Sequence, residues 1–272
     1  MNIQTGNHTR DLLLSSRDDT GVLHLTMNNP QARNALSEEM MAALQEAFDQ
    51  AHEDTQVRVI ILSGDGPVFS AGHDVKQISK RRTDEDNGKE YFQYILKTCS
   101  KLMTSIVRCR KPVIGQVSGT ATAAGLQLAA SCDLIIAGED ARFCTPGVNI
   151  GLFCSTPMVA LSRAVSRKHA MEMLLTGDMM DAETAFRFGL VNRVVGTAEL
   201  AQETAALAAK IASKSTAVVA IGKEAFYAQA ELSLDEAYAY CSEVMVTNLL
   251  MRDSEEGIGA MLEKRPPQWN DE

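Results

Sequence analysis

Residues 57–62 read VRVIIL, an almost unbroken apolar run. A strand that lies in the middle of a parallel sheet is covered on both faces and typically has this composition. Strands are also expected at 113–117 and 133–137, and segments with apolar residues at helical spacing separate the three strands. Strand and helix therefore alternate along the chain. This alternation predicts an α/β fold with a largely parallel sheet and helices on its faces.

The remaining elements follow from the same periodicities. Ser37 is the expected N-cap of a helix, because Glu38 and Glu39 follow it in the first turn. The other expected strands are 12–16, 22–27 and 191–195, and the expected helices are 38–53, 75–79, 85–108, 126–131, 157–174, 181–188, 199–213, 216–231, 234–250 and 253–263. We interpret the chain as one structural domain in three parts: a frayed tail over 1–10, a core over 11–200, and a helical oligomerisation region over 201–272.

Composition excludes several classes of function. The chain has 272 residues, of which 45% are hydrophobic, so it is long enough to bury a large core. A net charge of −9 argues against nucleic-acid binding, because the chain repels a phosphate backbone. The longest apolar runs fall well short of the ~18 residues that a membrane-spanning helix needs. We therefore expect neither a nucleic-acid partner nor a membrane span.

The six cysteines are scattered, with no C-x-x-C pair and no zinc-like spacing to histidine. This distribution predicts reduced, mostly buried thiols and no metal site. The first 20 residues are polar and lack the apolar segment of a signal peptide. On these grounds we expect a cytoplasmic location.

Two segments join a strand to a helix through small residues. The first is FSAGHDVK over 69–76, and the second is SGTATAAGLQLAASCD over 118–133. Glycine permits a close backbone approach, and the first amides of a helix have no partner within it. Either turn alone is typical of tight helix–sheet packing. On neighbouring strands, however, two such turns can direct two amide donors at one point, which is the geometry of an oxyanion hole.

These turns belong to a longer series of motifs. The series consists of NNPQARNALS (28–37), FSAGHDVK (69–76), 111–137, 171–195 and EGIGAMLEKRPPQW (256–269). In this order, and over roughly residues 12–269, it resembles the crotonase, or enoyl-CoA hydratase/isomerase, superfamily. FSAGHD and NIGLFCSTP together resemble the branch called enoyl-CoA hydratase domain-containing protein 3.

The resemblance implies a spiral of ββα repeats (the ClpP-like crotonase fold) and a C-terminal helical region that assembles into homotrimers or dimers of trimers. It also implies that an acyl-CoA thioester is the ligand, with coenzyme A bound as part of the substrate and no tightly held cofactor. The backbone amides of His73 and Ala124 would hold the thioester oxygen. The residues expected near the coenzyme A part, or beside the turn that faces it, are Arg33, Ala71, Asp74, Lys76 and Lys264, the last of them reaching a neighbouring subunit.

The sequence departs from a hydratase of this family at two positions. Gln127 and Gly147 stand where the family's hydratases have glutamates. Glutamine cannot act as a proton donor or acceptor in acid–base catalysis near neutral pH, and glycine has no side chain. General acid–base catalysis is worth roughly 100–10,000-fold for each group. We therefore expect weak or absent hydratase activity. His73, Cys154 and Asp74 are the nearby substitutes. The His73 ring is, however, expected to be exposed or structural, Cys154 to be a buried thiol and Asp74 to be a helix cap.

Three readings stay open at this point. The first is an acyl-CoA-binding hydratase homologue in fatty-acid or acyl-CoA metabolism. The second is an enzyme of other chemistry on the same scaffold, such as a thioesterase, decarboxylase or isomerase. The third is a non-catalytic acyl-CoA sensor or assembly subunit. RNA binding is disfavoured by the net charge of −9.

Overall fold

The computed structural model describes residues 12–271, so the predicted tail over 1–10 lies outside the described residues. Its main sheet has six strands in the order β1-β2-β3-β4-β6-β9. Only β1 and β2 pair antiparallel, and the remaining neighbours are parallel. These strands are β1 (Leu13–Arg17), β2 (Val22–Met27), β3 (Val59–Gly64), β4 (Val113–Val117), β6 (Leu134–Gly138) and β9 (Arg193–Val195). The predicted α/β class and largely parallel sheet are confirmed.

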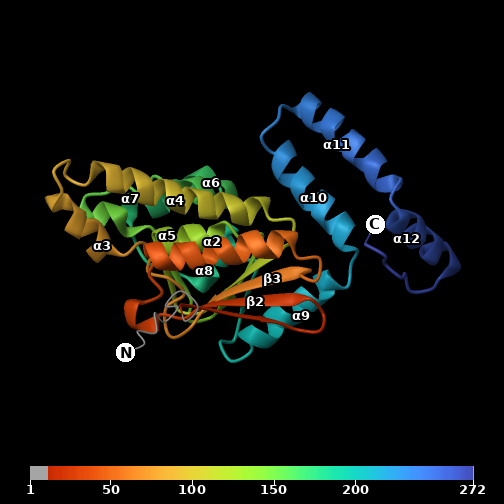
Figure 1. Cartoon of the computed structure of the whole chain (residues 1–272), viewed down its shortest axis with the longest axis horizontal. Helices are drawn as coiled ribbons and strands as arrows, with labels where there is room; N and C mark the ends of the chain where they lie inside the picture. The colour runs from red at the N-terminus through yellow and green to blue at the C-terminus, as the bar shows by residue number, and fades with distance from the viewer. Residues whose placement is uncertain (1–11, 272) are drawn as a thin grey trace, which may run out of the picture.

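Strand β3 is covered on both faces, as its composition predicted. Ile60 and Leu62 belong to the larger core cluster, which lies between the sheet and helices α2 (Glu38–Glu53), α4 (Lys89–Arg108) and α5 (Ala124–Ala130). Val59 and Ile61 belong to a second cluster with α9 (Leu200–Ala212). Figure 1 shows α2 and α4 on one side of β2 and β3, and α9 on the other. Because successive side chains of β3 point to opposite faces of the sheet, the strand packs against one layer of helices on each face.

A second sheet of three short strands was not predicted from the sequence. It contains β5 (Thr120–Thr122), β7 (Arg142–Cys144) and β8 (Met180–Asp181) in the order β5-β7-β8. Strands of two or three residues are too short to show a period of two. This sheet matters because β5 forms the approach to the second small-residue turn.

Two expected helices differ from those in the structure. The helix expected over 157–174 is divided into α6 (Pro157–Ala164) and α7 (Arg167–Thr176), and the Ser166 side chain caps the second by accepting from His169 N. The helix expected from residue 85 begins at Lys89, because Gly88 has a φ of 85° and the Asp86 carboxylate binds the amides of Gly88 and Glu90. The other short elements are α3 (Val75–Lys80), α8 (Ala182–Phe188) and the 3-10 turns η1 (Pro30–Ala32), η2 (Arg81–Thr83) and η3 (Pro146–Ile150).

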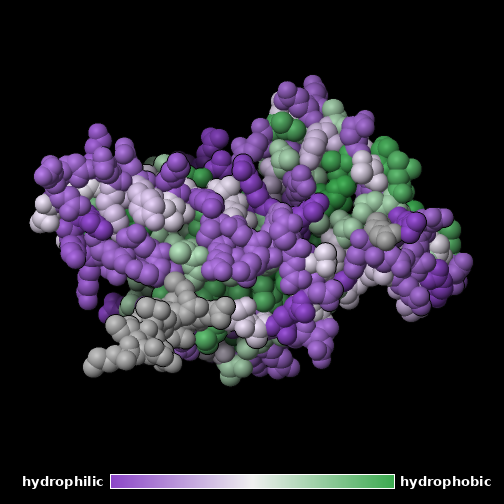
Figure 2. Space-filling view, in the orientation of Figure 1, coloured by the Kyte–Doolittle hydropathy of each residue, from purple (hydrophilic) through white to green (hydrophobic). Residues whose placement is uncertain are grey.

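The last three helices form an arm that extends away from the sheet (Figure 1). They are α10 (Thr216–Gln229), α11 (Leu234–Leu249) and α12 (Arg252–Glu263). Leucine side chains on this arm are unusually open to solvent, with Leu250 82% and Leu262 73% exposed. Figure 2 shows hydrophobic residues gathered over the arm. Within residues 12–271 no single helix meets the criteria for a membrane span, and α9 and α10 meet them only jointly, across a bend of 102°.

Candidate functional site

The two small-residue turns lie side by side. Ser70, in the turn after β3, donates its amide to Thr120 O at 3.2 Å and accepts from Thr122 N at 3.0 Å, so the first turn pairs with β5. A Cβ added to Gly125 would lie 2.2 Å from Ser70 O, far inside van der Waals contact. The second turn approaches the first this closely only because residue 125 has no side chain.

A hydrogen bond fixes the orientation of the peptide group between Gly72 and His73. Gly72 O accepts from Leu36 N at 2.7 Å. The peptide between Gly72 and His73 is trans, so the His73 amide points away from Leu36. The Ala124 amide nitrogen would lie 3.0 Å from a Cβ built on Gly72. The structure therefore brings the two amides predicted as a donor pair to neighbouring positions.

Neither amide is used elsewhere in the described chain. Over residues 12–271, no backbone hydrogen bond is found from His73 N or Ala124 N. Ala123, directly before the second donor, has a φ of 52° and a ψ of −119°, a conformation that non-glycine residues rarely adopt. Such strain persists only where the surrounding structure holds it, and it concentrates at functional sites. The arrangement is able to direct two N–H groups at one oxygen atom.

Asn34 and Ser70 hold the first turn in place, and sequence reasoning missed both. Asn34 is fully buried, and its side-chain amide donates to Asp65 O at 2.9 Å and Val68 O at 2.7 Å. The Ser70 hydroxyl donates to Asn34 O at 2.8 Å. The sequence feature that could have indicated this role is the asparagine at position 34. Asparagine tolerates a positive φ, and Asn34 has a φ of 49°.

Gln127 and Gly147 differ in their surroundings. Gln127 is 4% exposed, and its Oε1 lies 3.9 Å from the Cys99 thiol, a weak contact. A Cβ added to Gly147 would lie 2.9 Å from both Cys154 Sγ and Leu152 O. The space that a side chain at 147 would enter is thus filled by Cys154. That thiol is 8% exposed, and burial raises its pKa, as expected of a structural cysteine.

The side chain of His73 is the least satisfied polar group near the turns. Both ring nitrogens are buried and make no hydrogen bond within the described residues. Burial lowers the pKa of this imidazole, and the backbone of Leu36 beside the ring acts in the opposite direction. Sequence reasoning favoured an exposed or structural role for the ring, and its buried nitrogens argue against exposure.

The residues expected around coenzyme A are only partly brought together. Arg33 is exposed, and its carbonyl accepts from Ala71 N at 3.0 Å, so it lies beside the first turn. Lys76 is exposed in the first turn of α3. The Asp74 carboxylate caps α3 by accepting from Lys76 N at 2.8 Å and Gln77 N at 3.3 Å. Lys264 ends α12 on the arm, far from the turns of its own chain (Figure 1).

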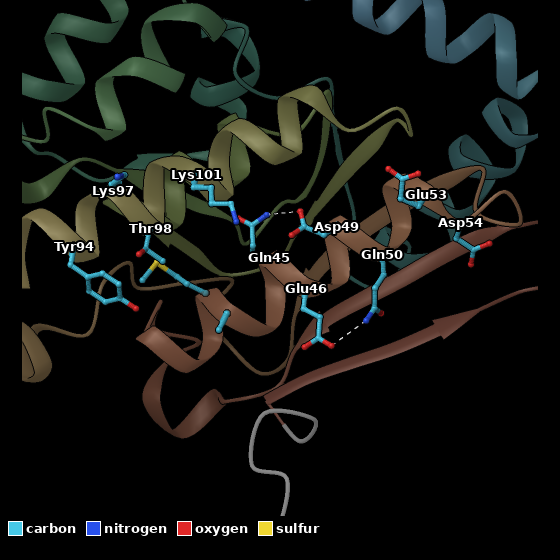
Figure 3. Close-up of a pocket in the computed structure, with 12 residues that line it drawn as sticks. Gln45, Glu46, Asp49, Gln50, Glu53, Asp54, Tyr94, Lys97, Thr98 and Lys101 are labelled. Carbon is cyan, nitrogen blue, oxygen red and sulfur yellow. Dashed lines mark hydrogen bonds between the residues drawn. The ribbon is translucent and has the colours of Figure 1, made fainter.

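A large groove lies elsewhere, between α2 and α4, with a volume of about 1220 Å³. Figure 3 shows Gln45 and Asp49 of α2 near Lys101 of α4, whereas Glu46 points away from α4 toward Gln50. It contains none of the site residues predicted from the sequence, and Gln45–Asp49 and Gln50–Glu46 hydrogen bonds occupy part of its wall. We therefore place the candidate site at the turns. In the described part of the chain, no group of three or more His, Cys, Asp or Glu side chains is arranged to hold a metal ion.

Comparison with known proteins agrees with the fold and the motifs. A family profile described as enoyl-CoA hydratase/isomerase matches residues 17–272. Human enoyl-CoA hydratase domain-containing protein 3, mitochondrial, is 47% identical over 258 residues, which cover 95% of this chain and 84% of that protein. The crystal structure of that human protein has a TM-score of 0.89 at 46% identity, covering 95% of this chain and 100% of the other. A Mycobacterium smegmatis enoyl-CoA hydratase structure has a TM-score of 0.90 at 48% identity, covering 95% and 98%.

These relatives overturn one expectation and confirm another. The human, Xenopus laevis and rat proteins are all named as mitochondrial, so the expectation of a cytoplasmic location is contradicted. That expectation rested on the polar composition of residues 1–20, which carries no such information. The predicted resemblance to the domain-containing protein 3 branch is confirmed. By profile match, identity and fold, the chain belongs to the enoyl-CoA hydratase/isomerase family, the crotonase superfamily.

Proposed function

We propose that this protein binds an acyl-CoA thioester, with the thioester oxygen between the backbone amides of His73 and Ala124. The observation that carries the proposal is the pair of neighbouring amides without a backbone partner in residues 12–271. Family members act on acyl-CoA substrates, and backbone donors of this kind stabilise the negative charge that develops on a carbonyl oxygen. Coenzyme A enters as part of the substrate, with Arg33, Lys76 and Lys264 as the candidate phosphate contacts.

The chemistry proposed for this site is not efficient hydration. Hydration needs one group to activate water and another to protonate the carbon next to the carbonyl. The Gln127 side chain does not titrate near neutral pH and so cannot act as a general acid or base, and Gly147 has no side chain and no free space for one. Backbone donors without those acids favour reactions that proceed through an enolate or a tetrahedral oxyanion, such as isomerisation, decarboxylation or thioester cleavage. A non-catalytic acyl-CoA sensor is the remaining alternative.

Binding and turnover are tested separately. Titration calorimetry with butyryl-CoA, a saturated thioester, is expected to give saturable binding, whereas free butyrate gives none. Crotonyl-CoA hydration, followed by loss of the enoyl absorbance, is expected to run at least 100-fold slower than in a relative that keeps both glutamates. The same protein is then offered a panel of thioesters, and mass spectrometry identifies any product. Hydration at the relative's rate contradicts the proposal, and a failure to bind butyryl-CoA removes its basis.

We also propose that the arm formed by α10–α12 binds other copies of the chain. Several of its side chains are apolar and open to solvent, including Leu234 at 72% and Met261 at 70% exposure. A contiguous apolar surface of this kind normally marks an interaction site. Homotrimers or dimers of trimers fit this surface, and they would bring Lys264 to the ligand of a neighbouring subunit.

A further inference from the structure

Ser70 connects the two small-residue turns with every polar group that it has. Its amide donates to Thr120 O at 3.2 Å and its carbonyl accepts from Thr122 N at 3.0 Å, so its backbone ties the first turn to β5. Its side chain is fully buried, and the hydroxyl donates to Asn34 O at 2.8 Å and accepts from Gly72 N at 3.3 Å. An alanine at position 70 would leave both of these groups without that partner.

Gly72 is held on both sides of its α-carbon. Its amide donates to the Ser70 hydroxyl, and its carbonyl accepts from Leu36 N at 2.7 Å. The Gly72 carbonyl and the His73 amide belong to one planar peptide group, so a contact that orients the first also orients the second. The Ser70 hydroxyl therefore acts on the first proposed donor through a single intervening residue.

Gly72 also lies directly against the second proposed donor. A Cβ built on Gly72 would be 3.0 Å from both Thr122 O and Ala124 N. Two amides stabilise one oxygen only while each lies about 2.7–3.1 Å from it, so the distance between them has to be fixed. Ser70 contacts both sides of this junction, because its hydroxyl holds Gly72 and its carbonyl holds Thr122.

Asn34 keeps the acceptor of the Ser70 proton in place. The Asn34 side chain is fully buried and donates to Asp65 O at 2.9 Å and Val68 O at 2.7 Å, in the segment that leads from β3 to the first turn. Its own oxygen accepts from Asn29 N at 2.9 Å. With Asn34 O fixed, the Ser70 hydroxyl has one direction for its proton and keeps a lone pair for the Gly72 amide.

We propose that the Ser70 hydroxyl is a positioning group that sets the geometry of the two amide donors. This inference rests on the proposed function, in which the amides of His73 and Ala124 hold the thioester oxygen. Without the hydroxyl, the peptide group before His73 is expected to turn, and its hydrogen bond to the ligand weakens while the remainder of the acyl-CoA still binds. A hydrogen bond between neutral groups is worth about 2–10-fold in affinity.

The test compares two ligands, one of which lacks the carbonyl oxygen. The thioether S-butyl-CoA has a methylene group in place of the carbonyl of butyryl-CoA and accepts no hydrogen bond there. Calorimetry should show that the wild type prefers butyryl-CoA by about 4–100-fold, the worth of two such hydrogen bonds. Ser70→Ala is expected to lower this preference by about 2–10-fold, with the dissociation constant for S-butyl-CoA unchanged.

Infrared spectroscopy of the bound ligand gives a readout that a general loss of stability does not move. A hydrogen bond lowers the stretching frequency of a carbonyl group. Butyryl-CoA with an isotopically labelled carbonyl should therefore absorb at a higher frequency on Ser70→Ala than on the wild type. Ser70→Cys fills the space of the hydroxyl but is a weaker donor and acceptor, so its frequency and preference should be intermediate. This variant carries the test if Ser70→Ala does not fold.

Thr204→Val is the matched control. The Thr204 hydroxyl is also fully buried, and it donates to Leu200 O at 2.7 Å within α9, on the opposite face of the sheet from the turns. Its loss should leave the preference and the frequency at the wild-type values. A wild type without preference for butyryl-CoA overturns the proposed function. A wild-type preference that persists in both Ser70 variants, or falls equally in Thr204→Val, overturns this inference alone.

Discussion

At the scale of single residues, the two positions that lack glutamates are not equivalent. Gln127 is buried beside the Cys99 thiol, in a site that already accommodates a side chain of glutamate's length. At Gly147, an added Cβ would lie only 2.9 Å from Cys154 Sγ. A glutamate at 127 would therefore fit but be poorly solvated, whereas one at 147 would have to displace Cys154. Restoring hydratase chemistry would need changes in the 147–154 loop and not a single substitution.

His73 should also make stability depend on pH. Its folded-state pKa lies below the unfolded value of about 6.5. The unfolded chain then binds more protons between these two pKa values, so stability is complete above about pH 6.5 and falls with pH below it. Urea unfolding at pH 7.5 and pH 5.0 should show a smaller loss for His73→Gln than for the wild type. An equal loss in the wild type and His73→Gln would contradict the prediction.

At the scale of elements, the sequence was informative where a signal is local. The cap at Ser37 accepts from Met40 N as predicted, and β2 and the helix over 38–53 have their predicted bounds. The strands of the second sheet were missed because residues 120–122 are specified by pairing with distant residues 142–144. The two turns were recognised as motifs, but their contact through Ser70 and Gly125 is a tertiary contact between segments far apart in the sequence. No local pattern predicts a backbone approach so close that a Cβ at position 125 would lie 2.2 Å from Ser70 O.

That approach makes Gly125→Ala a test of the junction between the turns. The new methyl group would meet Ser70 O, a backbone atom that cannot rotate away, so the turns must separate. We expect a loss of about 1–3 kcal/mol in the free energy of unfolding and weaker butyryl-CoA binding. Gly222→Ala is the matched control, because a Cβ at that position in α10 meets nothing within 4 Å. It should stabilise the chain by roughly 0.5–1 kcal/mol. Equal unfolding energies and equal binding in the two variants would contradict this account.

At the scale of the whole molecule, a buried polar cluster fastens the arm to the sheet. Lys223 of α10 pairs with Asp133 at 2.6 Å and donates to Lys111 O at 3.0 Å. Asp133, next to β6, also accepts from the Tyr227 hydroxyl at 2.8 Å and from Val113 N at 2.7 Å. The Lys223 and Asp133 side chains are only 8% and 17% exposed. The start of the arm is therefore held at one end by charge, while most of its length makes few contacts with the core.

Removing the lysine alone should be more damaging than removing the pair. Lys223→Met leaves the Asp133 carboxylate buried without its cation. We expect a loss of about 3 kcal/mol in the free energy of unfolding, at the low end for a broken buried ion pair because Tyr227 and Val113 remain as donors. The double variant with Asp133→Asn removes the uncompensated charge and should recover part of that loss. Urea unfolding of both variants at pH 7.5 measures the difference. A double variant less stable than Lys223→Met would show that the ion pair does not anchor the arm.

The exposed surface of the arm predicts self-association that depends on its apolar side chains. Leu250 is 82% and Met261 70% exposed, so a charge at either position costs little in an isolated chain. Between copies the same charge would be buried, which is strongly unfavourable. Light scattering coupled to size-exclusion chromatography should give a trimer or hexamer mass for the wild type and a smaller mass for Leu250→Glu with Met261→Glu. Leu14→Glu, at a 50% exposed leucine on β1, is the control and should keep the wild-type mass. If the arm variant also keeps that mass, the copies associate through another surface, and Lys264 loses its proposed route to a neighbouring ligand.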